Sequence, residues 1–371
     1  MRNFIPVNRP IIGEIEKKFV LECLDSGWIS SEGPFVSRFE EVFAKRVSRK
    51  YAIACANGSA ALDIAVAALG IGDGDEVIMP TFTIISCAAA VVRSGAKPIV
   101  VDADPYSWNM DVNQVANAIT SRTVAIMVVH IYGLPVDMDP VLKLAKLHGL
   151  AIIEDAAELI GGNYKGKLCG SFGNISTFSF YPNKHITTGE GGMVVTDDQE
   201  LAERCRSYRN LCFKSDARFV HEELGWNYRM TNLQAALGLA QLEQLDLFLA
   251  KKKEVGEYYF HHLRKLKSVV NPLLSTSYAE NLFWVYGLVL ADKRYNAREL
   301  MKLLNSKAIG TRPFFYPMHL QPVFTRSDMF NSLHMPVSEN LAMNGFYIPS
   351  GLGMSVDEQD YVIKTLFEIF E

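Results

Sequence analysis

The sequence predicts an α/β protein with a large domain built on a mostly parallel, mixed sheet and a smaller C-terminal α+β domain. From about residue 50 onward, short apolar runs alternate with longer segments of helical periodicity, which is typical of strand–helix–strand units. With 371 residues, the chain is also too long for one small core. We therefore expect two domains, residues 1–245 and 246–371.

The individual elements follow from this alternation. Strands are expected where short apolar runs lie between turn residues, at 51–55, 76–79, 98–102, 124–129, 150–154, 175–180 and 192–195. Helices are expected where apolar residues recur with helical spacing, at 60–69, 85–93, 112–119 and 140–148. A helix from 233 to 249 that continues toward Leu263 would link the domains. The C-terminal part adds an expected strand at 283–290 and a helix at 298–304.

Composition excludes several classes of protein. The net charge of −4 and the pI of about 6.1 lack the basic excess of nucleic-acid-binding proteins. No run of about 18 apolar residues occurs, and residues 1–6 lack a hydrophobic signal core, so we expect a cytoplasmic protein without a membrane span. The six cysteines are scattered without a C-x-x-C pair, which indicates reduced thiols and no metal site.

The first candidate site lies at residues 57–60, where an expected strand ends in a turn of small residues and a helix begins. Backbone amides at a helix start, together with the hydroxyl of Ser59, can bind an anion such as a phosphate. A simple N-cap by Ser59 is the more frequent use of such a serine, so both readings stay open on these residues.

The second candidate is the acidic end of the strand expected at 150–154. Glu154, Asp155 and Glu158 follow an apolar run, and buried carboxylates need partners. Asp155 could pair with a pyridinium nitrogen, because a carboxylate there keeps the ring protonated and makes it an electron sink. A solvated strand end or a set of metal-binding carboxylates is the alternative.

The third candidate is Lys184, in a tight turn between two expected strands. A lysine taken out of water has a lowered pKa and can form a Schiff base. Hydroxyl groups and glycines crowd residues 178–192, and glycines let the backbone approach a ligand closely. A lysine in a turn is more often simply exposed to solvent, but the many hydroxyl groups and glycines around Lys184 favour a functional lysine.

A phosphate seat, an acid for a ring nitrogen and a Schiff-base lysine, in this order, suit pyridoxal 5′-phosphate (PLP). The segments WISSEG (28–33), EDAAE (154–158), ITTGEGGM (186–193) and NYRMTN (227–232), with residues 178–192, resemble the DegT/StrS family of sugar aminotransferases. The resemblance extends from residue 28 to about 350. It implies the PLP-dependent transferase fold type I, as in aspartate aminotransferase, and transfer of an amino group to a nucleotide-linked keto sugar.

The resemblance also implies residue roles. Lys184 would attach the cofactor and move the proton, Asp155 would pair with the pyridine nitrogen, and Glu158 would lie near the ring hydroxyl. The residues implied to hold the phosphate are Gly58, Ser59, Ser179 and, reaching into the neighbouring subunit, Asn227. The active unit would then be a homodimer with shared active sites. The residues implied to bind the substrate are Trp28, Arg312, Tyr316 and His319.

Two positions need separate interpretation. Family members usually stack an aromatic ring on PLP, and Ile84 falls at that position here. We expect Ile84 to form an aliphatic wall and a looser cofactor grip, with a shifted Phe82 as the alternative. A related branch of the family carries histidine in place of the lysine and dehydrates the sugar at C3. Lys184 occupies that position and His185 follows it, so we expect an aminotransferase.

Within the family, the motifs look closest to enzymes that make GDP-perosamine. The favoured reaction moves an amino group from L-glutamate to C4 of GDP-4-keto-6-deoxymannose, for O-antigen or surface polysaccharide synthesis. A UDP- or dTDP-linked keto-deoxysugar, aminated at C4 or C3, is the alternative. A nicotinamide-dependent epimerase or reductase would need a strand–GxGxxG–helix unit, which the sequence lacks. A non-catalytic relative would usually lack the lysine or carry a DNA-binding domain.

Overall fold

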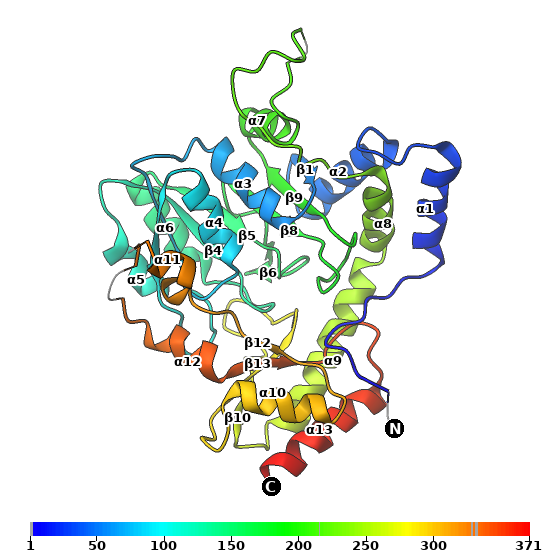
Figure 1. Cartoon of the computed structure of the whole chain (residues 1–371), viewed down its shortest axis with the longest axis vertical. Coiled ribbons are helices and arrows are strands. Elements are labelled where there is room, and N and C mark those ends of the chain that lie inside the picture. Colours follow the sequence, from blue (N-terminus) through cyan, green and yellow to red (C-terminus); the bar gives the residue numbers. More distant parts are fainter. Residues whose placement is uncertain (1–2, 215, 328, 331–332) are drawn as a thin grey trace.

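The computed structural model describes residues 3–214, 216–327, 329–330 and 333–371. Two sheets organise these residues, one of seven strands and one of four. Figure 1 shows the large sheet with its helices in the upper part of the molecule and the smaller sheet below it, with α9 (Leu245–Leu263) running from one to the other.

The large sheet has the strand order β1-β9-β8-β5-β4-β2-β3. Four neighbouring pairs are parallel, whereas β9 runs antiparallel to both β1 and β8. All seven predicted strands are present: β1 Tyr51–Cys55, β2 Glu76–Pro80, β3 Lys97–Val101, β4 Thr123–Val129, β5 Ala151–Asp155, β8 Ile175–Ser179 and β9 Gly192–Thr196. The predicted mostly parallel, mixed sheet is therefore confirmed.

Helices cover both faces of this sheet because its strands are apolar on both faces. In β4, Ala125 and Met127 join one core cluster, and Ile126 and Val128 join another. The helices of the large sheet's region are α1 Glu14–Ser26, α2 Pro34–Arg46, α3 Gly58–Ala68, α4 Ile85–Arg93, α5 Val112–Ala118, α6 Met138–His148, α7 Gln199–Arg209 and α8 Asn232–Glu243. A small hairpin, β6 Asn163–Tyr164 and β7 Lys167–Leu168, lies beside it.

The predicted continuous helix from 233 to 263 was wrong, because the helix breaks at Gln244. This residue has φ −105° and ψ 4°, outside the helical region, and it separates α8 from α9. Its side-chain amide donates a 2.6 Å hydrogen bond to Glu16 Oε1, which also accepts from Gln241. The buried carboxylate of Glu16 in α1 thus accepts hydrogen bonds from the side-chain amides of Gln241 and Gln244. Helical periodicity does not reveal such a tertiary contact.

The second sheet is antiparallel, with the order β10-β11-β13-β12. Its strands are β10 Val269–Val270, β11 Tyr286–Leu290, β12 Arg312–Pro313 and β13 Gly345–Ile348. The helices of this part are α10 Ala297–Ser306, η1 Met318–Leu320, α11 Pro322–Thr325, α12 Pro336–Asn344 and α13 Val356–Phe370. The predicted strand at 283–290 begins only at Tyr286, since Phe283 has a positive φ of 51°.

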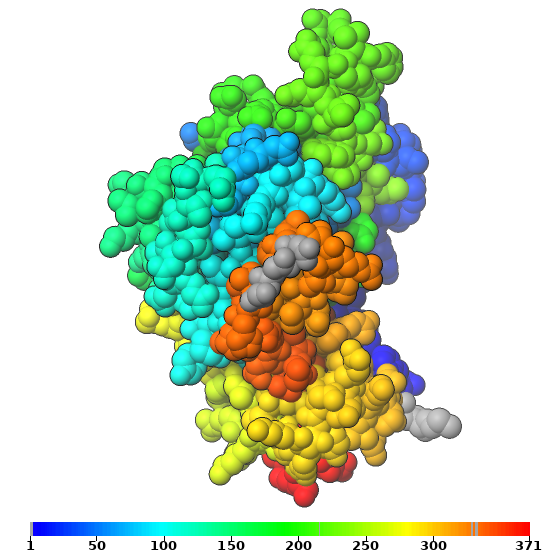
Figure 2. All heavy atoms as spheres, turned by 60° about the vertical axis from the view of Figure 1, so that its left-hand side comes forward, coloured from blue at the N-terminus to red at the C-terminus, as the bar shows by residue number. Residues whose placement is uncertain are grey.

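Packing joins the two sheets more closely than the expected division at 245/246 suggests. The segment around η1 and α11 lies over the large sheet's helices, and its Phe324 belongs to the same core cluster as Ala125 (Figure 2). At the other end of the chain, Ile5 bridges to Ile309 and packs with the second sheet. In the described part of the chain, no helix has the length and apolarity that a membrane crossing requires.

A buried carboxylate fixes the functional end of β5. Glu154 is fully buried and accepts hydrogen bonds from the backbone N–H of Phe172 (2.8 Å) and Gly173 (3.1 Å). The Nδ1 of His130 accepts from Val136 N, so its Nε2–H donates to Glu154 at 3.1 Å. Burial raises the pKa of Glu154, but the His130 hydrogen bond and the amides of Gly170 and Phe172 outweigh it and lower the pKa overall.

We predict that Glu154→Gln lowers the free energy of unfolding by about 2–4 kcal/mol, because an NH₂ group would then face N–H donors. The folded-state pKa is depressed, so this contribution is complete above the ordinary carboxyl pKa of about 4.3 and is lost as the pH falls through the folded value. Chemical denaturation at pH 7.5 and pH 4 measures both effects. The exposed Glu22→Gln serves as control, and equal stability of Glu154→Gln and wild type would contradict the assignment.

Candidate active site

A cavity of about 560 Å³ opens at the carboxyl ends of β5 and β8, where ligands of parallel α/β sheets bind. Chain segments from both sheets line it. Seven of the predicted cofactor residues lie in its wall: Gly58, Ser59, Ile84, Asp155, Glu158, Ser179 and Lys184. The structure therefore brings together the three motifs that the sequence singled out.

Asp155 ends β5 with a side chain that is 3% exposed. Its Oδ1 accepts from Ala157 N at 3.0 Å and its Oδ2 from the Cys87 thiol at 3.3 Å. Burial raises the pKa of Asp155 and also raises that of Cys87, which keeps the thiol protonated as a donor. A cation placed against this carboxylate would restore its ionised form.

Lys184 and Glu158 form a close pair in the wall of the same cavity. Lys184 Nζ lies 3.7 Å from Glu158 Oε1, and the other oxygen of Glu158 accepts from Tyr132 N at 2.9 Å. Burial lowers the pKa of Lys184, while the negative charge of Glu158 opposes this. Burial also raises the pKa of Glu158 to about 7. Burial therefore shifts both groups toward their neutral forms, and the pair is close enough to interact as acid–base chemistry requires.

The phosphate seat forms at the start of α3. Asn57, not Ser59, is the N-cap: its side chain accepts from Ala60 N at 2.9 Å. Ser59 therefore does not cap the helix, and its hydroxyl oxygen lies 2.6 Å from that of Ser86. A Cβ at Gly58 would come within 2.8 Å of Ser179 Cβ, so only glycine lets these backbones meet. The open amides and two serines match an anion site.

The structure places Ile84, not Phe82, at the cavity. Ile84 precedes α4 with 42% of its surface exposed and lines the wall. Phe82 is fully buried and packs against the rings of Tyr132, Phe314 and Phe315. An aliphatic side chain therefore forms this part of the cavity wall.

His185 does not enter the cavity, although it follows Lys184 in sequence. It is fully buried, and burial together with the charges of Lys252 and Lys184 lowers its pKa to about 3. The imidazole is neutral at physiological pH. Lys184 lines the cavity and His185 is not among its lining residues, which supports the aminotransferase interpretation over the dehydratase.

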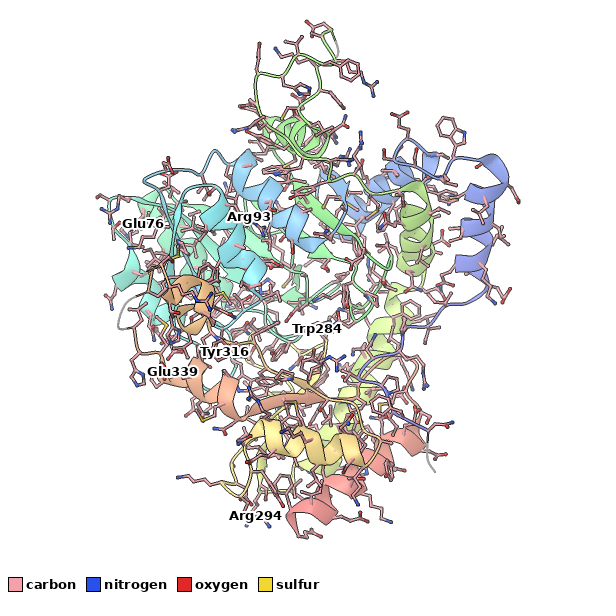
Figure 3. The ribbon with its side chains drawn as sticks, in the orientation of Figure 1. Glu76, Arg93, Trp284, Arg294, Tyr316 and Glu339 are labelled. Carbon is pink, nitrogen blue, oxygen red and sulfur yellow. The ribbon has the colours of Figure 1, made fainter. Side chains whose placement is uncertain are left out.

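The predicted substrate residues and Asn227 lie outside this cavity in the single chain. Trp28 and Tyr316 are each 51% exposed, and Arg312 is exposed on β12 (Figure 3 labels Tyr316). His319 is different, because it is 2% exposed. Its Nδ1 lies 2.8 Å from Thr81 Oγ1 and its Nε2 lies 3.1 Å from Glu339. The prediction of a direct substrate contact by His319 does not fit this buried position.

Several cavity residues escaped the sequence analysis. Ser86 could have been found, since it follows the same small-polar, helix-start pattern as Ser59. Thr177 and Asn183 each bury a side-chain oxygen that has no partner within the described residues. Trp284 and Tyr347 come from the second sheet, and no local signal connects them with residue 184. Figure 3 shows Trp284 between the upper and lower parts of the molecule.

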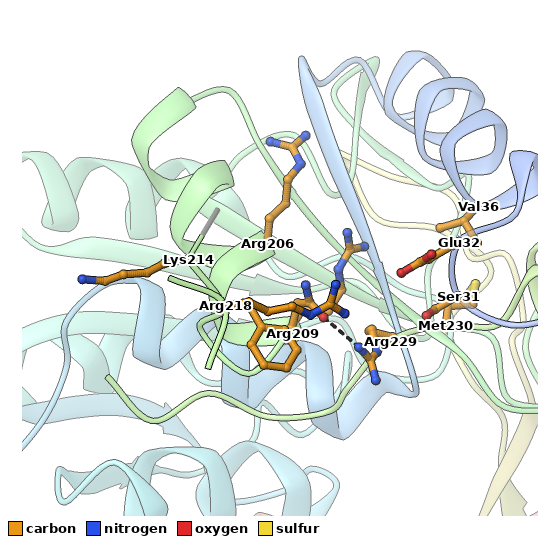
Figure 4. Close-up of a pocket in the computed structure, with 11 residues that line it drawn as sticks. Ser31, Glu32, Val36, Arg206, Arg209, Lys214, Arg218, Arg229 and Met230 are labelled. Atoms are coloured by element: carbon orange, nitrogen blue, oxygen red, sulfur yellow. Dashed lines mark hydrogen bonds between the residues drawn. The ribbon is translucent and has the colours of Figure 1, made fainter. Parts of the chain in front are cut away.

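A second cavity, of about 460 Å³, lies near the end of α7 (Figure 4). Its basic lining residues are Arg206, Arg209, Lys214, Arg218 and Arg229. Arg229 donates a 2.9 Å hydrogen bond to Asn210, and the backbone of Asn210 bridges to Asn227. Asn227 therefore lies near this basic cavity and is not among the residues that line the cavity with Lys184.

A family model for DegT/DnrJ/EryC1/StrS aminotransferases matches residues 10–367. The chain belongs to this family. It is 42% identical over 369 residues to the GDP-perosamine synthase of Escherichia coli O157:H7, covering 99% of each chain. It is also 42% identical over 366 residues to the GDP-perosamine synthase of Caulobacter vibrioides, covering 98% of each. The solved structure of S. venezuelae DesV is 31% identical, with a TM-score of 0.90 over 100% of this chain and 99% of that one.

Enzymes of the DegT/DnrJ/EryC1/StrS family depend on PLP, and this cavity fits that cofactor. The open start of α3 can take the phosphate, and the buried Asp155 can take a protonated ring nitrogen. The buried amine of Lys184 can react with an aldehyde. Thr177 offers a buried hydroxyl that no described residue satisfies. Fold type I is likewise confirmed by the solved relatives.

We predict that Glu158→Gln lowers the pKa of Lys184 by about 1 unit, because the variant removes the negative charge that favours the ammonium form. The effect should appear mainly above pH 7, where Glu158 ionises. The rate at which the cofactor-free chain combines with PLP, followed by absorbance against pH, reports this pKa. Glu190→Gln, another acid of the cavity wall, is the control. An unchanged midpoint in Glu158→Gln would refute the pairing.

Proposed function

We propose that this chain transfers an amino group from L-glutamate to C4 of GDP-4-keto-6-deoxymannose and so produces GDP-perosamine. The carrying observation is the buried Lys184 amine, 3.7 Å from Glu158, in the cavity that also holds Asp155. The 42% identity to two GDP-perosamine synthases supports the choice of nucleotide and sugar. The product would enter O-antigen or surface polysaccharide synthesis in the cytoplasm.

The chain's own groups divide the work. PLP, when bound, withdraws electrons from the carbon that loses its proton. Asp155 would hold the ring nitrogen protonated, and Gly58, Ser59 and Ser179 would anchor the phosphate. Lys184 would take the proton from the α-carbon of glutamate in the first half-reaction and return one to C4 of the sugar in the second. Positioned acid–base groups typically contribute about 10²–10⁴-fold to such steps.

We further propose a homodimer in which Asn227 reaches the phosphate in the partner's cavity. Its position outside its own cavity supports this arrangement. The loop after α7 projects from the body of the molecule (Figure 1) and exposes Phe219 (80%) and Leu224 (91%), as an interface would require. The neighbouring basic cavity would suit a nucleotide diphosphate. Trp28, Arg312 and Tyr316 remain proposed contacts to the sugar nucleotide.

The half-reactions test the proposal directly. Glutamate should bleach the visible absorbance of the PLP-loaded enzyme, and GDP-4-keto-6-deoxymannose, added after the excess is removed, should restore it. Mass spectrometry should then find an aminated GDP-sugar. Lys184→Ala should fold but lose turnover by at least about 10²-fold, and clear residual transamination would contradict the role of Lys184.

The acceptor is tested by the same measurement with other sugars. Recovery of absorbance with a UDP- or dTDP-linked keto-deoxysugar, but not with the GDP-sugar, would retain the aminotransferase and overturn the GDP assignment. If glutamate does not bleach the absorbance of the PLP-loaded enzyme, the assignment of glutamate as the amino donor would be wrong.

We predict that Ile84→Tyr tightens PLP binding, because an aromatic ring at the cavity wall adds stacking worth about 0.5–1.5 kcal/mol. Retention of the cofactor during dialysis, measured by absorbance, should rise by about 2- to 10-fold. Leu62→Met, a volume-conserving change elsewhere in the wall, is the control. Unchanged or weaker retention in Ile84→Tyr would count against the position assigned to Ile84.

A further inference from the structure

A second buried lysine lies close to the active site and has no role in the proposed reaction. Lys252, on α9, is 3% exposed. No carboxylate pairs with it in the described ranges, and burial alone lowers its pKa to about 7. Burying an amine without a counter-charge is costly, so its retention needs an explanation.

The amine makes two hydrogen bonds to backbone carbonyls of the second sheet's region. Lys252 Nζ donates to Trp284 O at 2.8 Å and to Ser350 O at 2.6 Å. Trp284 precedes β11 and Ser350 follows β13, and these strands pair antiparallel. The hydroxyl of Ser350 also accepts from Tyr286 N at 3.1 Å. The lysine thus ties the end of this strand pair to the helix that joins the two sheets.

The residue held by this tie contacts the reactive amine. The ring of Trp284 lies 3.8 Å from Lys184 Nζ, within range of a cation–π interaction. Its indole N–H donates a 2.7 Å hydrogen bond to Asn183 O, the carbonyl that precedes Lys184. Trp284 therefore touches the catalytic turn twice, and both contacts depend on where its backbone lies.

We propose that Lys252 is a positioning residue: its buried amine holds the backbone of Trp284 and thereby keeps the indole against Lys184. The inference rests on the proposed role of Lys184 as the amine that receives the cofactor. A neutral amine retains two N–H donors, so both carbonyls remain bonded whether Lys252 is protonated or not. The tie therefore holds both above and below the pH at which Lys252 loses its proton.

Removal of the tie should change the acid–base behaviour of Lys184. The titratable groups that interact with its amine are Glu158, Asp155, Cys87 and the neutral His185, and all four are retained in the variants below. The indole face favours the ammonium form, so its displacement lowers the pKa of Lys184. A cation–π contact of ordinary strength corresponds to a shift of about 0.5–1 pH unit.

The test measures how fast the full-length, cofactor-free chain combines with PLP as a function of pH, since only the neutral amine of Lys184 reacts. Lys252→Met should lower the midpoint by about 0.5–1 pH unit, and Lys252→Arg, which keeps N–H donors, should restore it at least partly. Lys251→Met is the matched control, because Lys251 lies next in the same helix and pairs with Glu254 at the surface. Its midpoint should equal that of wild type.

A double-mutant cycle separates positioning from general support of the fold. In a Trp284→Leu background, Lys252→Met should cause no further shift. An equal shift with and without the indole would overturn the proposal, as would a lower melting temperature with an unchanged midpoint. If Lys252→Met does not fold, Lys252→Leu, which also lacks an N–H donor, replaces it with the same expected direction. The assay contains neither glutamate nor sugar, so a wrong substrate in the proposed function would leave its result unchanged.

Discussion

The active site depends on the burial of charge at one edge of a parallel sheet. Glu158 and Asp155 are buried and the Lys184 side chain is only 10% exposed, and burial lowers the pKa of the amine and raises those of the acids. Buried ionisable groups of this kind are costly unless partners fix their geometry. Much of the surrounding structure consists of those partners, and burial brings the pKa of Glu158 to about 7.

The partners come from parts of the chain that are far apart in sequence. Glu154 accepts hydrogen bonds from backbone amides of the 170–173 loop. These bonds fix the end of β5, where Asp155 lies. The thiol of Cys87 reaches Asp155 from α4. The second sheet contributes Trp284, which contacts the Lys184 turn from the other side. Residues from the regions of both sheets therefore surround the amine of Lys184.

The sequence predicted what local patterns encode. All seven strands of the large sheet follow from short apolar runs, and the three motifs of the cavity follow from strand ends and helix starts, where ligand-binding residues collect. The choice of Ile84 over Phe82 also agrees with the structure. The motifs could be joined in advance because parallel strands bring their carboxyl ends to one edge.

The features that escaped prediction are tertiary. At the helix break, Gln244 donates a hydrogen bond to Glu16, more than 200 residues earlier in the chain. His319 resembles a site residue in sequence, yet its ring is held by Thr81 and Glu339. Lys252 lies in a charged stretch of the expected helix, and the packing of α9 against the second sheet's region buries it. Periodicity cannot identify partners that lie on other elements.

The most direct measurement is the site of covalent attachment. The PLP-loaded enzyme is reduced with borohydride and digested, and the pyridoxyl-labelled peptide is identified by mass spectrometry. Attachment at Lys184, with none at the nearby buried Lys252, is the predicted result. A label on Lys252 or on another lysine would contradict the placement of the reactive amine beside Glu158 and Asp155.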